Sequence, residues 1–344
     1  MKKSILFALF LIFVFSSNAQ NTFYYLEDMQ QRQFLNPSFV PKSKFYLALP
    51  GVSGLSIQAY NSGFNYNELH NFIDQLSNPD YNPDEFVNSI GASNRFISEA
   101  KANLLGFGFK TNDKVFLSFN VTLNHIMTLE AESDLAYLLA DFNDINDIKF
   151  PVIVDGIDLN TNNYLNFGFT CSRRINEHLT LGISPNINFN LAGIKTNNLT
   201  YIVDIESEDE YGNQEYNQTI SGEVIVGLPT EMNPDAVVGN KFDLAQGILS
   251  DNWGKNLSLA EIFANKNLSL DLGATYELNK WHFSASLLNI GHSNWKINGY
   301  RLRGDENDIL IHEEKIKIGI PPKLYLGAAR QFSPNWNYGL MITN

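Results

Sequence analysis

The sequence is poor in cysteine, in charge and in long apolar runs. One cysteine, Cys171, stands among 344 residues, so no disulfide can form within the chain. Charged residues make up 18% of the chain, below the roughly 25% of an average soluble domain. Basic residues are outnumbered, and the net charge of −13 argues against a nucleic-acid-binding protein, which carries basic patches.

The apolar runs are too short for a membrane-spanning helix, which needs about 20 residues. The longest, Ile5–Phe15, follows Lys2 and Lys3 and precedes the small residues Ser17-Asn18-Ala19. This order of charged, apolar and small residues is typical of a secretory signal peptide. We therefore expect residues 1–19 to be a signal peptide and the protein to be exported. The residue directly after the cleavage site is Gln20 and not cysteine, so a lipoprotein is not expected.

The clearest pattern in the mature chain is a strand–turn–strand repeat at Leu268–Leu288. Apolar residues alternate with small polar ones on both sides of Asn279–Lys280, a two-residue turn that would place Leu278 opposite Trp281. In a soluble sandwich or barrel the apolar face would form the core, whereas in a membrane barrel it would meet lipid. The second face carries mostly Ser, Gly, Thr and Asn, which favours the membrane barrel.

The same alternation recurs along the chain, at residues 44–49, 55–60, 105–109, 115–124, 165–172, 179–191, 199–205, 219–226, 324–328 and 336–342. Short turns near 111–113, 176–178, 279–280 and 333–335 alternate with long connections near 61–101, 129–162, 227–266 and 291–322. Short turns on one side and long loops on the other are typical of bacterial outer-membrane barrels. We predict an all-β fold, a transmembrane antiparallel up-and-down β-barrel of about 12–14 strands when complete, with short helices in long loops.

The expected organisation is a signal peptide at 1–19, an irregular segment at 20–42 that is a candidate plug, and an outer-membrane barrel over 43–344. Helices are expected near 69–76, from apolar residues at helical spacing, after Asn82-Pro83, at Asp134–Ala140 and after Ser258. Pro185 predicts a bulge or bend in its strand. About eleven strands can be counted, while bacterial barrels normally use an even number. We favour the interpretation that one or more closing strands are missing.

No pattern predicts catalysis, a cofactor site or a metal site, and we expect none of these. The histidines show no metal-binding spacing; they are His70, His125, His178, His282, His292 and His312. His282 and Glu277 fall on the proposed interior face, as does Asp271. We favour interior hydrogen-bond networks over catalysis for these residues.

Two other groups of residues have competing interpretations. The acidic stretches comprise Asp141, Asp144 and Asp147, and Glu206, Glu208, Asp209 and Glu210. They favour solvated loops over calcium sites, because the first lacks the glycine and terminal glutamate of a calcium loop. The aromatic residues near strand ends are Tyr276, Trp281, Trp295, Trp336 and Tyr338. They favour girdles at the membrane interface over a sugar-stacking site.

Three short motifs carry a resemblance to a known family. They are Asn36–Pro41, Asn61–Tyr66, and Leu287–Gly291 together with Trp295. With them, the mature chain resembles an uncharacterised family of outer-membrane β-barrel proteins from Bacteroidota. More loosely it is similar to the PorP/SprF and PorV proteins associated with type IX secretion, and to FadL-like fatty-acid channels. The resemblance implies an N-terminal plug, for which Asn21–Pro41 is the candidate, and it carries over no catalytic residues.

These observations lead to two expected functions. The first is a non-enzymatic outer-membrane channel or transporter for small solutes, hydrophobic ones included. The second is a component of a secretion or surface-assembly complex. Expected partners are outer-membrane lipid, a small solute or other secretion proteins, and not nucleic acid. An outer-membrane hydrolase is the weakest alternative, because no cluster of Ser, His and acidic residues is apparent.

Overall fold

The computed structural model describes residues 29–50, 53–63, 66–75, 84–89, 93–132, 151–208, 214–227, 262–263, 266–291, 297–305, 308–316, 320, 322–333 and 336–343. Within these ranges the protein is all-β, and its 13 strands belong to one antiparallel sheet. In the same part of the chain, no helix is both long and apolar enough to cross a membrane. The predicted signal peptide lies outside the described residues.

The elements in chain order are η2 (Gln30–Phe34), β1 (Phe45–Ala48), β2 (Leu55–Asn61), α3 (Tyr66–Gln75), α4 (Asp84–Ser89), β3 (Ser93–Asn112), β4 (Val115–Glu132), β5 (Val152–Arg174), β6 (Leu179–Glu208), β7 (Gln214–Gly227), β8 (Lys266–Leu278), β9 (Trp281–Ile290), β10 (Ile297–Asp305), β11 (Asp308–Ile316), β12 (Lys323–Ser333) and β13 (Trp336–Thr343). Helices α3 and α4 confirm the two helices expected near residues 69–76 and after Asn82-Pro83. The helices expected at Asp134–Ala140 and after Ser258 fall outside the described residues or on their border.

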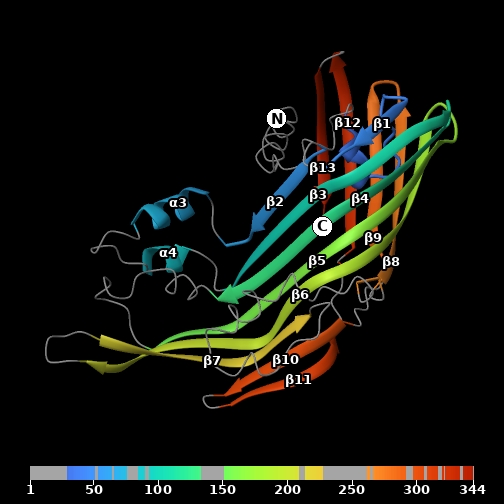
Figure 1. The fold of residues 1–344 in the computed structure, drawn as a ribbon. Helices are drawn as coiled ribbons and strands as arrows, with labels where there is room; N and C mark the ends of the chain where they lie inside the picture. Colours follow the sequence, from blue (N-terminus) through green and yellow to red (C-terminus); the bar gives the residue numbers. More distant parts are fainter. Residues whose placement is uncertain are drawn as a thin grey trace, which may run out of the picture.

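The main path through the sheet runs β1-β3-β4-β5-β6-β8-β9-β12-β13. Strand β1 pairs with residues 106–109 of β3, and β2 pairs with residues 96–102 of the same strand. Strands β7, β10 and β11 leave this path. The first part of β6 pairs with β8 over Leu179–Phe189, and its second part pairs with β7 over Gly193–Glu208. Strand β7 then pairs with β10, and β10 with β11, which forms a wing beyond the main sheet (Figure 1).

The main sheet is curled. Strands β3 and β12 stand next to opposite ends of the path, yet Lys323 of β12 makes an ion pair with Glu99 of β3. Residues 29–41 form hydrogen bonds with β4, β5, β8 and β9 on the enclosed side. The end strands β1 and β13 are not paired with each other among the described residues, so the sheet is open.

The register of the β8–β9 hairpin follows from its sequence. Leu278 pairs with Trp281 across the two-residue turn, as predicted. Asn279 in that turn has a φ of 54°, which asparagine tolerates better than most residues and which the tight turns of hairpins require. The turns before β4 and β6 use asparagine differently. Asn112 and Asn176 each accept two backbone N–H hydrogen bonds at 2.8–2.9 Å through the side-chain oxygen.

Several strands are longer than the sequence pattern predicts. The expected loop at 61–101 contains the start of β3, and the expected loop at 129–162 contains the ends of β4 and β5. Residues 199–205 continue β6 and do not form a separate strand. The expected loop at 291–322 contains β10 and β11. In β3 and β5, β-bulges interrupt the alternation; register shifts occur at Asn103/Leu105 in β3 and near Gly156 in β5. Strands β10 and β11 pair without a register shift, so a bulge does not explain why their stretch was expected to be a loop.

The prediction of a bulge at Pro185 is wrong. Around this residue β6 keeps one continuous register with β8, and its register with β5 is the same before and after. Near Pro185 the β5–β6 ladder lacks the residue pairs between Gly168–Asn186 and Cys171–Ile183. Proline has no N–H to donate, so the strand loses pairing with β5 locally while its register is preserved.

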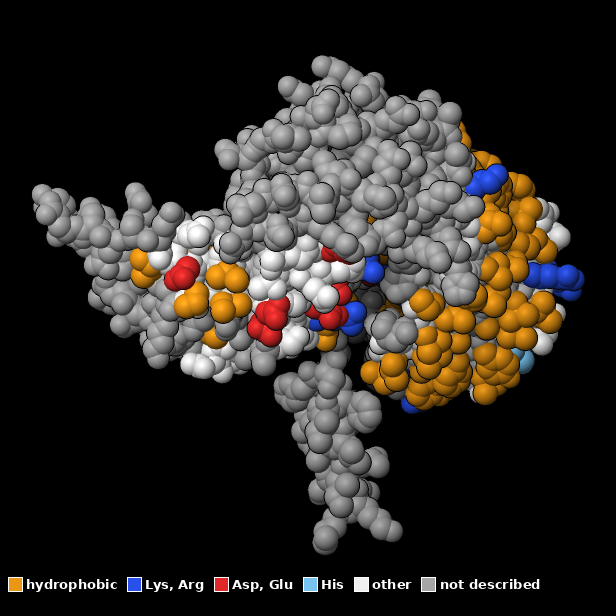
Figure 2. Space-filling view, turned by 90° about the horizontal axis from the view of Figure 1, so that it is seen from below, with side chains coloured by type: hydrophobic (Ala, Val, Ile, Leu, Met, Phe, Trp, Pro, Cys, Tyr) orange, Lys and Arg blue, Asp and Glu red, His pale blue; other side chains and the backbone are white. Residues whose placement is uncertain are grey.

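Burial in the main sheet is inverted relative to a water-soluble protein. Polar residues face the enclosed side and are buried, among them Asn120, Thr122, Asn124, Thr170, Ser172, Ser184, Asn186, Asn188, Asn190 and Thr275. Large apolar residues face outward and are exposed, among them Leu47, Ile57, Leu105, Phe107, Phe109, Phe169, Leu181, Ile183, Leu268, Leu272, Phe283, Leu326 and Ile342. Figure 2 shows hydrophobic side chains gathered into a broad surface with few charged groups on it.

Candidate functional site

The N-terminal segment, defined here as residues 29–41, lies against the enclosed face of the sheet. Its first turn is the 3-10 helix η2, and the two prolines that follow prevent regular structure. Its backbone carbonyls are instead satisfied by the sheet. The Ser172 hydroxyl donates to the carbonyl of Pro37 at 2.6 Å, and the Ser286 hydroxyl donates to the carbonyl of Leu35 at 2.5 Å.

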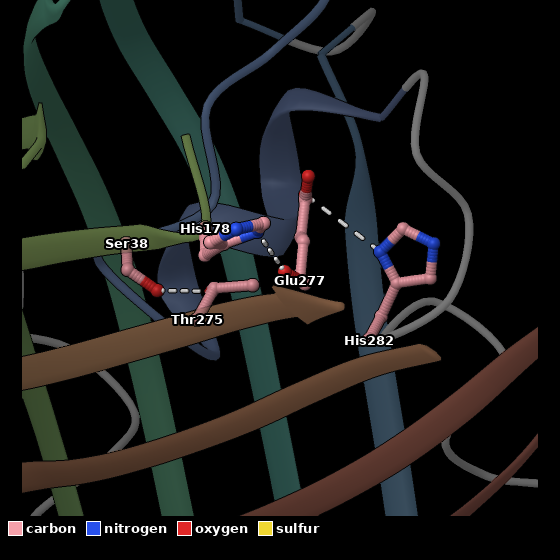
Figure 3. A network of polar contacts seen from close by, with 5 residues as sticks. All are labelled: Ser38, His178, Thr275, Glu277 and His282. Atoms are coloured by element: carbon pink, nitrogen blue, oxygen red, sulfur yellow. Dashed lines mark hydrogen bonds and ion pairs between the residues drawn. The ribbon is translucent and has the colours of Figure 1, made fainter. Parts of the chain in front are cut away.

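Asn36 and Ser38 anchor the segment from its own side. The Asn36 side-chain oxygen accepts hydrogen bonds from the Ser38 backbone N–H at 2.9 Å and the Ser38 hydroxyl at 2.6 Å. The Asn36 amide nitrogen donates to the carbonyl of Ala285, in β9, at 3.2 Å. The Ser38 and Thr275 hydroxyls lie 2.5 Å apart, and Figure 3 marks their contact with a dashed line. Both Asn36 and Ser38 are buried, so these bonds form away from solvent.

Two glycines provide the space for this contact. Gly182 of β6 and Gly273 of β8 are directly paired across the two strands. A Cβ atom on Gly182 would overlap the backbone of Pro37 and Ser38, and one on Gly273 would overlap the Asn36 side chain. Glycine within a strand often marks a place where another backbone approaches closely. The paired glycines therefore form a groove that fits residues 36–38.

A cavity of about 240 Å³ lies between the N-terminal segment and the sheet. It is further from the short turns than the groove is. Its apolar wall includes Phe34, Leu35, Leu55 and Leu288. Its polar wall is formed by side chains from β3, β4, β5, β6, β8 and β12. A mixture of apolar surface and a few converging polar groups is characteristic of small-molecule sites.

Two carboxyl side chains, Glu99 and Asp271, and two lysine side chains, Lys101 and Lys323, line this cavity. Lys323 and Glu99 neutralise each other in the ion pair between β12 and β3. Lys101 lies with its ammonium 5.1 Å from the centre of the Phe34 ring. It makes no ion pair or hydrogen bond through its side chain with any residue in the described ranges.

Asp271 is positioned by a bulge. The β8–β9 register shifts between Leu270 and Leu272, and the Asp271 carboxylate accepts the Asn289 backbone N–H at 2.7 Å. Its second oxygen accepts the Asn186 amide at 2.8 Å. Asn289 has a φ of 58°, which is consistent with a bulge that turns its N–H toward the carboxylate. Asp271 thus belongs to an interior hydrogen-bond network, the kind of role favoured from the sequence.

One buried polar side chain in the cavity wall has no partner. Asn103 is 3% exposed, and neither its amide nitrogen nor its amide oxygen makes a hydrogen bond. A buried, unsatisfied amide costs about 1–3 kcal/mol, so such groups are rare and call for an explanation. Asn103 was not identified from the sequence, because the stretch around it shows no strand alternation.

The comparison with protein families places the chain in a group. Residues 37–318 match the model described as a family of unknown function, DUF5723. The chain belongs to the DUF5723 family. No curated protein and no solved structure matches it. The family match begins at Pro37, within the N-terminal segment. In this DUF5723 protein it therefore includes Pro37 and Ser38, which contact Gly182, as well as most of the sheet.

A second cavity, of about 670 Å³, opens at the short-turn end of the DUF5723 sheet. Its lining is rich in basic residues, namely Arg32, Lys42, Lys110, Lys114 and Arg174. His282 also lines it, with Nδ1 3.6 Å from the Glu277 carboxylate, and nearby His178 Nδ1 lies 2.9 Å from the Glu277 carbonyl (Figure 3). Within the described ranges, no group of three His, Cys, Asp or Glu residues could hold a metal ion.

Among the remaining residues singled out from the sequence, His125 lines the cavity of about 240 Å³, with Nδ1 2.8 Å from the Asn163 side-chain oxygen. The aromatic residues near strand ends whose side chains the structure describes line neither cavity. Tyr276 and Trp281 are 42% and 38% exposed on the outer face, and Trp281 stacks on Phe283 with ring centres 5.9 Å apart. Trp295, the first acidic stretch and His292 lie outside the described residues, as do the side chains of Trp336 and Tyr338. What the DUF5723 interior offers is a polar, partly charged wall opposite apolar residues, suited to holding a small molecule.

Proposed function

We propose that this protein is an outer-membrane β-barrel that binds small solutes in its interior and lets them pass, with the N-terminal segment as a gate. The inverted burial of the sheet carries this proposal. Phe107 and Leu268 are 39% and 69% exposed while Asn188 and Asn190 are 2% and 0% exposed. A water-soluble sheet buries its apolar face, whereas a membrane barrel turns that face to lipid and keeps polar side chains inside.

The proposal places a requirement on the free strand edges. In lipid, unpaired backbone N–H and C=O groups cost several kcal/mol each, so open edges are not tolerated in the hydrocarbon region. The edges of β1–β2 and β13 must therefore be paired within the bilayer. The Lys323–Glu99 ion pair, which holds β12 to β3, supports a sheet curled far enough for its two edges to approach each other.

The membrane location can be tested with a fluorophore on the outer face. Cys171 is first replaced by serine, and Phe107→Cys is then labelled with an environment-sensitive dye. In vesicles that contain lipids with a quencher near the acyl-chain centre, we expect strong quenching of the dye, because residue 107 faces outward on β3. Asp113→Cys, at the turn of the same hairpin, is the matched control and should be quenched weakly. Equal quenching at both sites, or none at either, contradicts the proposal.

A second candidate function is a component of a secretion or surface-assembly complex, and the wing of β7, β10 and β11 favours it. Strand β11 pairs only with β10 among the described residues, so it presents a strand edge. Exposed edges are templates for pairing with another chain.

This second function is tested by proline substitution, because proline removes one backbone donor. Successive N–H groups in a strand point in opposite directions, so one of Leu310→Pro and Ile311→Pro removes a donor from the open edge of β11. That variant should lose a partner that the parent protein retains when purified from native membranes. A parent protein that purifies without any stable partner argues against this function.

A further inference from the structure

We infer that the cavity of about 240 Å³ beside the N-terminal segment is a binding site for a small zwitterion with an apolar side chain, a molecule of the amino-acid class. This inference rests on the proposed function and specifies the solute that the interior receives. It depends on three groups in one cavity wall, Lys101, Asn103 and Asp271. Lys101 and Asp271 attract each other, but no hydrogen bond or ion pair joins any two of the three side chains.

Asn103 supplies the first observation. It is almost completely buried, both of its amide atoms lack a partner, and it lines the cavity. Its backbone N–H donates to the carbonyl of Gly54 at 3.2 Å, so the atoms of Asn103 that lack a partner are those of the side-chain amide. An amide that offers both a donor and an acceptor can bind either end of a zwitterion.

Lys101 supplies the second observation. It lies two residues before Asn103 on β3, and both side chains reach the cavity. The other cation in the wall, Lys323, already forms an ion pair with Glu99. Lys101 lies over the face of the Phe34 ring and is attracted by Asp271 and Glu99, but it makes no ion pair within the described residues. An ammonium next to an amide donor forms a site for a carboxylate, since hydrogen bonds to charged groups are the stronger ones.

Asp271 supplies the third. Its two oxygens each accept one neutral hydrogen bond, from Asn289 and Asn186. A carboxylate has about four lone-pair positions, so it retains capacity for a ligand ammonium. No cation among the described residues forms an ion pair with it.

The charge balance of the wall selects a zwitterion over a simple anion or cation. Glu99 and Asp271 balance Lys101 and Lys323, and adding a net charge to an enclosed site is costly. A zwitterion adds none, and it pairs with Lys101 and Asp271 at the same time. Phe34, Leu55 and Leu288 then provide an apolar wall for its side chain. The volume lies below the roughly 300–1,000 Å³ of sites for drug-sized ligands, which limits the ligand to a small molecule.

The test is equilibrium binding of L-leucine to the purified full-length protein in detergent micelles. We expect one saturable site. Two analogues of similar shape, 4-methylpentanoate without the amine and isopentylamine without the carboxylate, should each bind roughly tenfold more weakly, because each leaves one charged wall group unpaired. Lys101→Met should abolish the preference for leucine over isopentylamine, and Asp271→Asn the preference over 4-methylpentanoate.

Asn103→Leu separates binding from folding. Replacing an unsatisfied buried amide by an apolar group of similar shape is neutral or stabilising for the fold. The variant should therefore unfold at the same or a higher temperature and yet bind leucine roughly tenfold more weakly. Asn190→Leu is the matched control: Asn190 is also buried with an unpartnered amide, but it does not line the cavity. Asn190→Leu should unfold at the same or a higher temperature than the parent protein and should bind leucine with the same affinity.

The outcomes distinguish this inference from the proposed function. A protein whose outer face is quenched by lipid but which does not bind leucine overturns the zwitterion site and leaves the barrel intact. Equal affinity for leucine and either analogue also overturns it, as does equal leucine affinity in Asn103→Leu and the parent. A protein that is not quenched by lipid contradicts the proposed function instead, whatever it binds.

Discussion

Gly182→Ala is expected to raise the flux of small solutes through the reconstituted protein several-fold. The added methyl group would overlap the backbone of Pro37 and Ser38, and backbone cannot move aside as the end of a long side chain can. The N-terminal segment must therefore lift from the groove between β6 and β8. Liposome swelling with a small neutral sugar measures the change directly.

The size of this effect follows from the hydrogen bonds that hold the segment. Lifting residues 36–38 breaks the bonds to Ser172, Thr275 and the Ala285 carbonyl. Each contributes about 0.5–1.5 kcal/mol net, so their combined loss is a few kcal/mol. That is enough to convert a gate that is closed most of the time into one that is open most of the time, because 1.4 kcal/mol is about a tenfold change in an equilibrium.

Gly106→Ala is the control for this experiment. Gly106 is another buried glycine on the enclosed side, but its Cβ would meet the end of the Asn120 side chain and not the N-terminal segment. Its flux should equal that of the parent protein. If Gly182→Ala also leaves flux unchanged while the protein remains folded, the segment does not act as a gate.

The sequence predicted the hairpins of this fold well because their alternation and their turns agree. At β8–β9 the two-residue turn sets the register, and the apolar residues of both strands fall on one face, so only one pairing satisfies both. The all-β antiparallel sheet follows from the recurrence of that pattern. The two loop helices were predicted for a similar reason, since apolar spacing and a proline at the helix start are local signals.

The first half of β3 was missed for a physical reason. Before the register shift near Leu104, the residues that alternate with Glu99, Lys101 and Asn103 are Ser98, Ala100 and Ala102. Phe96 is the single large apolar residue on that face of this half strand, too few to produce an apolar alternation. The bulge also moves the inward-facing side chains from odd to even positions. A pattern with a fixed period of two therefore cannot follow the whole strand. The cavity wall is built from this half strand, so its residues could not be found from the pattern.

The groove for the N-terminal segment required the structure for a different reason. The motif Asn36-Pro37-Ser38 predicted only an irregular backbone, and the glycines opposite it lie about 145 and 236 residues further along the chain. Nothing local connects them. A signal was nevertheless present, because Gly182 and Gly273 both interrupt the polar face of otherwise regular strands, where a small residue implies close approach of another chain segment.

Leu272→Lys is expected to destabilise the protein in a bilayer by about 2–4 kcal/mol, the cost of a lysine on the lipid-facing side near the membrane centre. Leu272 lies in the middle of β8, is 41% exposed, and follows the bulge that places Asp271 in the cavity. Urea-dependent folding into vesicles, followed by the gel shift between boiled and unboiled samples, measures the change. Glu177→Lys, in the short turn before β6, is the control and should fold as the parent does.

The sign of the Leu272→Lys effect decides between the two environments of the outer face. If that face met water, exchanging an exposed leucine for lysine would remove apolar surface from solvent, and stability would stay the same or rise. If it meets lipid, the ammonium must be dehydrated or must reach the interface from mid-strand, and stability falls. Unchanged stability of Leu272→Lys would therefore mean that the outer face of this sheet is not in lipid. A partner protein would then be required to cover its apolar side chains.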